Sequence, residues 1–206
     1  MRVVASMKGV WKILGGVEVL RGIDLDVSEG EVIVVWGANG SGKTTLLRIM
    51  AGLMEPSRGE VRVVCGKACV GFMGHTPMLY PGLTVEENLK FFSSLYGVRL
   101  EDLTGSWAWR ALGLEAFRRV EVRRLSYGWR RRADLARALV GRPKLLLADE
   151  PLTGMDAGAA EAVASILRSL AESGGAVVAT TPKLDEGYMK LADRVLELRG
   201  GRLVEG

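Results

Sequence analysis

The stretch Gly37–Thr45 constrains the fold of this chain more than any other, because its sequence, GANGSGKTT, requires an unusual backbone. An apolar run at residues 32–36 precedes it and a second begins at Leu46, an order that predicts a strand, a glycine turn and a helix. The glycines of such a turn let successive backbone N–H groups point inward, where a side chain would obstruct them. The helix that follows adds the positive end of its dipole. The stretch therefore predicts a loop that binds phosphate.

Two side chains of this phosphate loop (residues 37–45) suit a nucleoside triphosphate with Mg²⁺. Lys43 is aimed at the outer phosphates, and Thr44 offers a hydroxyl ligand for the metal. A helix terminus alone contributes only about 0.3–1 kcal/mol at an exposed site, so these two side chains are expected to supply much of the rest. The candidate nucleotide-binding residues of the loop are Gly37, Ala38, Asn39, Gly40, Ser41, Gly42, Lys43, Thr44 and Thr45.

The length and composition fit one globular domain with a single core. The chain has 206 residues, of which 48% are hydrophobic and 25% charged, and no apolar run approaches the roughly 20 residues that span a bilayer. The first residues lack the long apolar core and cleavage site of a secretory signal. We therefore expect a cytosolic location, with any membrane role passing through a partner.

Arginine pairs and a triplet concentrate the net charge of +4 between residues 118 and 132. Such a cluster raises a nucleic-acid partner as one interpretation. The aromatic residues of an RNA-binding or single-strand-binding module do not interleave these arginines. We therefore interpret them as a solvated helical face plus a surface for a partner or for phosphate, and expect no nucleic-acid partner.

The order of apolar runs and turn residues predicts an α/β domain with a helical insertion. Residues 77–127 turn helical in pattern, and Thr84–Glu87 has the spacing of a capping box. Strands are predicted at residues 17–20, 23–27, 32–36, 59–64, 68–73, 145–148 and 176–179, with a closing hairpin at 195–198 and 202–204. Helices are predicted at residues 46–53, 133–140 and 159–170.

Two adjacent carboxylates, Asp149 and Glu150, follow four consecutive apolar residues. Such a run suits a parallel strand that is covered on both faces, and ligands bind at the carboxyl ends of such strands. Asp149 is predicted to hold Mg²⁺, and Glu150 to orient or deprotonate the water that attacks the γ-phosphate. The pair predicts a hydrolytic centre beside the phosphate loop.

A second anion site is predicted at Leu125–Trp129, with the sequence LSYGW, at the start of an arginine-rich helix. Ser126 offers a hydroxyl donor, and Gly128 permits close approach of the backbone. One chain therefore carries two devices that recognise phosphate.

Taken together, these motifs resemble a known family. GANGSGKTT, LSYGW, LLLADEP at Leu145–Pro151 and LTGMD at Leu152–Asp156 resemble, in order and separation, the Walker A, signature, Walker B and D-loop of an ATP-binding cassette (ABC) ATPase. The match covers nearly the whole chain. It implies an α/β fold: a P-loop NTPase core with a mostly parallel sheet, an N-terminal antiparallel β-subdomain and an inserted helical subdomain. Residues 1–206 would form one domain, with 1–75 and 130–206 as the nucleotide-binding core and 76–129 as the helical subdomain.

The resemblance also implies cofactors and partners. ATP and Mg²⁺ would be bound between two cassettes, identical or different, with Ser126 and Gly128 of one clamping the nucleotide on the phosphate loop of the other. A transmembrane permease would dock on the helical subdomain and hold the cassette at the cytoplasmic face of the cell membrane. The runs at residues 70–77 and 83–89 are similar to the ATP-binding subunit of the haem exporter of cytochrome c maturation. The cargo and its direction are set by the permease and are not encoded here.

Two positions near the nucleotide depart from the family pattern. The aromatic residue that stacks on adenine is replaced by Leu14, with Trp11 as a stand-in three residues earlier. Since stacking is worth about 1–3 kcal/mol per base in nucleic-acid binders, weaker nucleotide affinity is expected. The Q-loop position is His75, as in the haem-exporter type, and its imidazole is expected to contact water or metal.

The remaining departures concern the signature and the switch histidine. Tyr127 replaces a glycine and Trp129 a glutamine, which predicts a hindered approach across the dimer. Thr181 stands where a histidine normally touches the γ-phosphate. By analogy with other acid–base groups, we expect turnover to be slower by about 10²–10⁴ and a heterodimer with an intact cassette to be one solution.

Two other classes of function stay open at this stage. A soluble ABC ATPase acting on nucleic acid or ribosomes would share the motifs, but the interval from Gly42 to Leu125 is too short for the coiled coil of DNA-repair relatives. Translation-type relatives carry two cassettes in one chain, whereas this chain carries one. A nucleotide or small-molecule kinase would use the phosphate loop but would leave Leu125–Trp129 and Leu152–Asp156 unexplained.

Overall fold

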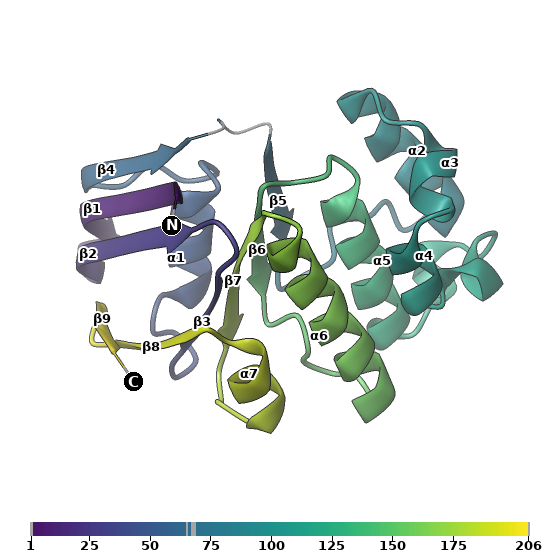
Figure 1. The fold of residues 1–206 in the computed structure, drawn as a ribbon. Helices are drawn as coiled ribbons and strands as arrows, with labels where there is room; N and C mark the ends of the chain where they lie inside the picture. Colours follow the sequence, from purple (N-terminus) through teal and green to yellow (C-terminus); the bar gives the residue numbers. More distant parts are fainter. Residues whose placement is uncertain (1, 65, 67–68, 206) are drawn as a thin grey trace.

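The strands of this protein form two sheets (Figure 1). A computed structural model describes residues 2–64, 66 and 69–205. The smaller sheet is antiparallel, in the order β2-β1-β4, and the larger one runs β5-β6-β7-β3-β8-β9, with every pair parallel except β8 and β9. The strands are β1 (Val3–Leu14), β2 (Val17–Ser28), β3 (Val32–Trp36), β4 (Arg58–Val63), β5 (Val70–Met73), β6 (Leu145–Asp149), β7 (Ala176–Thr181), β8 (Arg194–Arg199) and β9 (Arg202–Glu205).

Helices cover both faces of the larger sheet. The first helix, α1, lies between the two sheets, whereas α5, α6 and α7 lie on the opposite side and α2 to α4 lie farther out (Figure 1). The α-helices are α1 (Lys43–Met50), α2 (Val85–Tyr96), α3 (Leu100–Thr104), α4 (Trp107–Ala111), α5 (Tyr127–Leu139), α6 (Ala157–Glu172) and α7 (Glu186–Leu191), with 3₁₀ turns η2 (Leu114–Phe117) and η3 (Val122–Arg124).

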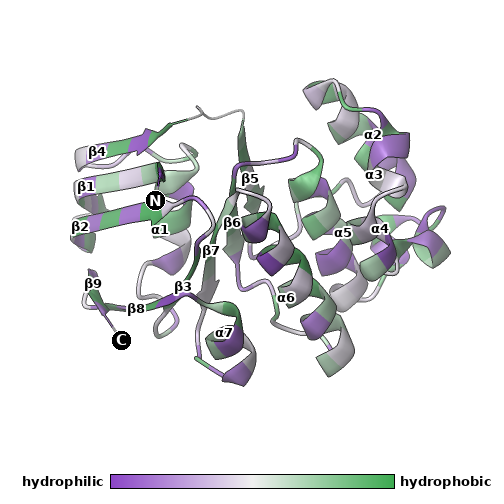
Figure 2. Ribbon diagram, in the orientation of Figure 1, coloured by the Kyte–Doolittle hydropathy of each residue, from purple (hydrophilic) through white to green (hydrophobic). Residues whose placement is uncertain are grey.

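Strand β3 shows why the sequence folds into these layers. Its residues Val32 and Val34 join the core under α5 and α6, while Ile33 and Val35 join the core around α1. Successive side chains of a strand point to opposite faces, so an uninterrupted apolar run requires cover on both sides. Figure 2 shows the same pattern, with apolar residues along the larger sheet and polar residues on the outer helices. The predicted α/β class, with a mostly parallel sheet and an antiparallel N-terminal sheet, is confirmed.

Local predictions differ in their outcome at three places, the start of α2, the strand β1 and the start of α5. The predicted capping box is confirmed at the start of α2, where the Thr84 hydroxyl accepts from the Glu87 N–H at 3.2 Å and the Glu87 carboxylate accepts from the Thr84 N–H at 2.8 Å. Strand β1 was not predicted, because register shifts against β2 interrupt its alternation of buried and exposed residues. Helix α5 begins at Tyr127, where the signature sequence was expected to open a helix and ahead of the predicted run 133–140, and so crosses the predicted boundary between residues 129 and 130.

Candidate functional site

The phosphate loop connects β3 to α1, as predicted. A Cβ on Gly37 would lie 2.5 Å from the Leu198 carbonyl oxygen, so a side chain there would displace β8. Gly42 precedes α1 with a φ of 107°, and a Cβ there would lie 3.0 Å from Val19 Cγ1. Both positions therefore require glycine for the loop to pack closely against its neighbours.

Lys43 is buried at the start of α1 and turns back over the loop. Its Nζ donates to the carbonyl oxygens of Gly37 at 2.7 Å and Ala38 at 3.0 Å. Burial lowers the pKa of Lys43, and the carboxylates of Glu150 and Asp149 partly offset that effect. The ammonium group is therefore held above the loop, next to two carboxylates, where a phosphate would compensate the cost of burial.

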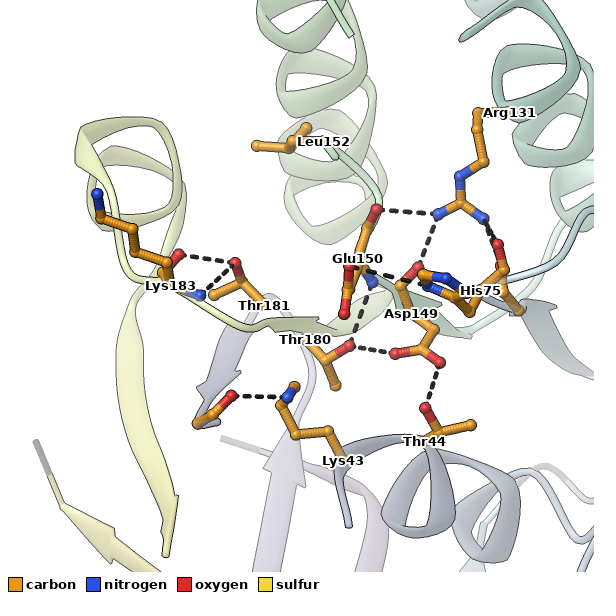
Figure 3. A network of polar contacts seen from close by, with 12 residues as sticks. Lys43, Thr44, His75, Arg131, Asp149, Glu150, Leu152, Thr180, Thr181 and Lys183 are labelled. Carbon is orange, nitrogen blue, oxygen red and sulfur yellow. Dashed lines mark hydrogen bonds and ion pairs between the residues drawn. The ribbon is translucent and has the colours of Figure 1, made fainter. Parts of the chain in front are cut away.

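Asp149 lies at the carboxyl end of β6 and is held from two sides (Figure 3). Thr44 Oγ1 donates to Asp149 Oδ2 at 2.7 Å, and Thr180 Oγ1 donates to Asp149 Oδ1 at 2.6 Å. The hydroxyl and carboxylate predicted to bind Mg²⁺ are thus in direct contact. Thr180 was missed by sequence reasoning, because one threonine at the end of an apolar run carries no distinctive pattern.

The residues present fit a magnesium–nucleotide complex. Mg²⁺ usually takes one or two protein oxygens and completes its shell with phosphates and waters. Thr44 and Asp149 provide such a pair, and among the described residues no group of three or more His, Cys, Asp or Glu could form a cage. The Ser41 hydroxyl of the phosphate loop is buried and has no hydrogen-bond partner among the described residues, which suits a phosphate oxygen as its acceptor.

Glu150 has a left-handed backbone, with a φ of 52°. Its N–H donates to Thr180 Oγ1 at 3.2 Å, and its Oε2 lies 3.8 Å from Nδ1 of His75 (Figure 3). The His75 side chain is 60% exposed and that of Glu150 is 14% exposed. The two side chains predicted to handle water thus face each other at the edge of the sheet.

Thr181 is buried at the end of β7, but its hydroxyl is engaged elsewhere. Its Oγ1 donates to the Lys183 carbonyl at 2.7 Å and accepts from the Lys183 N–H at 3.3 Å (Figure 3). Within the described part of the chain, no hydrogen bond joins this hydroxyl to Glu150 or Lys43. The predicted contact with the γ-phosphate would therefore require a rearrangement of this turn.

The signature segment (residues 125–129) opens α5, with Ser126 as its exposed N-cap. Gly128 packs near the carbonyl of Gly154, and the Tyr127 ring lies so close to Gly154 that a Cβ there would be 2.9 Å from it. Ser126 and Gly128 make no hydrogen bond to the phosphate loop in the described residues. The two predicted phosphate devices are therefore separate within one chain.

Trp129 points into its own helical region rather than outward. Its ring lies 4.0 Å from that of Phe117, and the Arg132 guanidinium lies 4.2 Å from the Trp129 ring. Trp129 also lines one pocket together with Ser126 and Gly128. Of the two residues predicted to hinder the approach across the dimer, Tyr127 is the exposed one, at 39%.

The two candidates for adenine contact lie on β1. Leu14 is 42% exposed and pairs with Val17 at the tip of the β1–β2 hairpin. Trp11 packs against β2, since a Cβ on Gly22 would lie 3.4 Å from its Nε1. At position 14, the tip of the hairpin therefore offers adenine an aliphatic side chain and no aromatic ring.

Arg131 is a buried residue that sequence reasoning misplaced on a solvated face. Its guanidinium donates to the carbonyl oxygens of Gly74, His75, Asp149 and Glu150 (Figure 3). The signal was present in the helical spacing, because residue 131 shares its face with the buried Leu135 and Ala138 once α5 starts at residue 127. The charge of three consecutive arginines had favoured a solvated face over the burial that this spacing indicates.

Comparison with protein families gives a match to the ABC transporter family over residues 20–153. The molybdenum import ATP-binding protein ModC of Mycobacterium tuberculosis is 39% identical in an alignment of 204 residues that covers 89% of this chain and 55% of that protein. The chain thus spans about half the length of this relative. The cytochrome c biogenesis ATP-binding export protein CcmA of Cupriavidus necator is 39% identical in an alignment of 197 residues that covers 91% of this chain and 87% of that protein.

Solved structures show the same similarity. An ATP-binding subunit of an ABC transporter matches with a TM-score of 0.90 and 25% identity, over 98% of this chain and 89% of that chain. A dimeric ATP-binding cassette, MJ0796, in a post-hydrolysis state with ADP and Pi, matches with a TM-score of 0.86 and 26% identity, over 97% of this chain and 96% of that chain. None of the described helices of this chain is both long and apolar enough for a membrane span.

Proposed function

This chain belongs to the ABC transporter family of ATP-binding proteins, and we propose that it binds and hydrolyses Mg-ATP as the motor subunit of a membrane transporter. The observation that carries the proposal is the meeting of three groups at one sheet edge. These are the loop ammonium of Lys43, the Thr44–Asp149 contact and the Glu150 carboxylate. Phosphate binding, metal binding and activation of water need these groups in this arrangement.

The residues divide the chemistry as follows. Lys43 offsets the charge of the outer phosphates, and the loop N–H groups hold their oxygens. Thr44 and Asp149 would hold Mg²⁺, which when bound would supply Lewis-acid stabilisation of the developing charge. Glu150 accepts the proton of the attacking water, and His75 lies close enough to orient that water.

Closure of the site requires a second cassette in this proposal. Among the described residues, Ser126 and Gly128 make no hydrogen bond to the phosphate loop of their own chain, and Ser126 is exposed, so the two residues can contact a nucleotide on a partner copy. The related MJ0796 cassette forms a dimer, which supports this arrangement. A second cassette, identical or different, is therefore the first proposed partner.

A transmembrane permease is the second proposed partner, with residues 76–129 as the helical subdomain on which it docks and residues 1–75 and 130–206 as the core. ModC and CcmA are named as import and export subunits, which supports transport without fixing its direction. A haem-exporter type is the narrower proposal, because CcmA relatives match over most of their own length. The cassette would then sit at the cytoplasmic face of the membrane.

The nucleic-acid alternative receives less support from the arginines. Arg118 pairs with Glu86 at 2.6 Å, and Arg123 pairs with Glu121 at 2.7 Å, so part of the cluster is already neutralised. Arginines on a solvated face that already pair with carboxylates do not require the phosphates of a nucleic acid to balance their charge.

The experiment is a nucleotide assay on the purified chain. We expect Mg-dependent ATP binding that the Lys43→Ala variant loses, and slow hydrolysis that the Glu150→Gln variant abolishes while its binding remains. Thr181→His should raise turnover if the missing switch histidine limits the rate. Failure of the wild-type chain to bind adenine nucleotides would refute the proposed function.

A further inference from the structure

We propose that Arg131 is a positioning residue that fixes Glu150 and the His75 segment to each other. Its catalytic consequence rests on the function proposed above, whereas its structural consequence does not need a nucleotide. The proposal starts from one buried side chain that reaches two segments far apart in the sequence (Figure 3).

The guanidinium of Arg131 divides its two terminal nitrogens between two segments. Nη1 donates to the Gly74 carbonyl and, at 3.1 Å, to that of His75. Nη2 donates to the Asp149 carbonyl at 2.7 Å and to the Glu150 carbonyl at 2.9 Å. The first segment follows β5, and the second consists of the last residue of β6 and the residue after it. Since β5 and β6 are neighbours in the sheet, one side chain joins the carboxyl ends of two adjacent strands.

The chemistry of this contact requires arginine. A guanidinium presents its donors in a rigid planar fork, whereas a lysine ammonium is a compact point charge on a flexible stem. Arg131 is 0% exposed and, within the described residues, forms no ion pair and leaves its Nε without a hydrogen-bond partner, so the carbonyls bonded to Nη1 and Nη2 are the only groups that offset its charge. Burying an unpaired charge is costly, and an apolar residue would serve better if packing were the only purpose.

The backbone of Glu150 gives the second reason. Its φ of 52° is unusual for a residue with a side chain, and such strained backbone gathers at functional sites. Here the carbonyls of Asp149 and Glu150 both accept from the same nitrogen of Arg131. Arg131 therefore stabilises the turn that sets the direction of the Glu150 side chain.

The consequence concerns the spacing of two side chains. His75 Nδ1 and Glu150 Oε2 lie 3.8 Å apart, and the backbones of both residues are held by Arg131. Because Arg131 belongs to α5, which begins at the signature segment, it links that helix directly to the water-activating pair. Loss of the Arg131 guanidinium should leave the phosphate loop intact but let the side chains of His75 and Glu150 move apart.

The structural test uses the only histidine of the chain, which gives a single ring signal in NMR spectra of the untagged protein without nucleotide. In the wild-type background, Glu150→Gln should displace this signal because the carboxylate faces the ring. In the Arg131→Gln background the displacement should be lost. Arg130→Gln is the matched control, since Arg130 neighbours Arg131 on α5 but, among the described residues, its side chain donates to neither of the two segments that Arg131 joins, and this control should keep the displacement. An equal displacement in all three backgrounds would overturn the proposal.

The kinetic test separates positioning from general structural damage. Arg131→Gln should lower kcat by about 10–100-fold, the size of loss expected from a small misplacement, while the Kd for Mg-ATP stays close to wild type. Arg131→Lys should recover the melting temperature more fully than kcat, because it restores a charge but not the fork. If kcat is unchanged in the folded variant, or if Kd worsens as much as kcat, Arg131 does not act through Glu150. A wild-type chain that does not bind Mg-ATP would instead count against the proposed function.

Discussion

Thr180 offers the sharpest test of how this site is held together. Its hydroxyl donates to Asp149 Oδ1 at 2.6 Å and accepts from the Glu150 N–H at 3.2 Å, so it connects the predicted metal ligand to the predicted base. Thr180→Val keeps the β-branched shape at a fully buried position and removes only the hydroxyl. The change therefore isolates the polar contacts from the packing of β7.

The expected cost follows from those two contacts. A hydrogen bond to a charged group contributes about 1.5–3 kcal/mol and a neutral one about 0.5–1.5 kcal/mol. Thr180→Val should therefore lower the free energy of unfolding by about 2–4 kcal/mol. Thr181→Val is the matched control, because the partners of its hydroxyl are neutral, the Lys183 backbone and the Tyr188 side chain, and loss of its neutral hydrogen bonds should cost about 1–3 kcal/mol.

Urea unfolding with EDTA and without nucleotide measures both costs. A second measurement compares the affinity for ATP with and without Mg²⁺, since a loosened Asp149 should weaken the magnesium-dependent part alone. Equal destabilisation by the two valine variants would refute the reasoning, as would a loss of ATP affinity that does not depend on Mg²⁺.

Three further predictions concern single side chains. Thr181→Ala should leave turnover close to wild type, because its hydroxyl is engaged with Lys183, and a large loss in a steady-state ATPase assay would contradict this. Leu14→Tyr should strengthen ATP binding by about 1–3 kcal/mol through stacking but leave tripolyphosphate binding unchanged, which calorimetric titration would check. Burial raises the pKa of the Tyr188 hydroxyl to about 12, so the neutral phenol is favoured in the fold. Its stabilising contribution, about 2–3 kcal/mol, should be present below pH 10 and lost towards pH 12, measured as the difference in unfolding free energy between wild type and Tyr188→Phe.

The sequence was sufficient where a pattern has one structural solution. The phosphate loop between β3 and α1, the fully buried β6 and the capping box of α2 were each predicted from residue types and spacing. In each of these places local propensity and tertiary packing agree. The loop in particular needs glycine where Leu198 and Val19 approach it.

The sequence was insufficient where a side chain acts over long range. Arg131 was misplaced because three consecutive arginines suggest a solvated face, whereas its partners are backbone carbonyls of residues 74, 75, 149 and 150, to which no sequence pattern points. The hydroxyl of Thr181 was expected near phosphate, yet a local turn with Lys183 engages it. The direction of Trp129 depends on contacts with Phe117 and Arg132 that only the fold brings together.

The central claim is that one nucleotide is held between the phosphate loop of one cassette and Ser126 of another. Light scattering on the Glu150→Gln variant with saturating Mg-ATP tests it most directly, because blocked hydrolysis should trap the closed state. The account predicts a dimer that forms with Mg-ATP, separates when ATP is replaced by ADP, and does not form when Lys43→Ala is added. A variant that binds Mg-ATP and yet remains a monomer at saturation would contradict the claim.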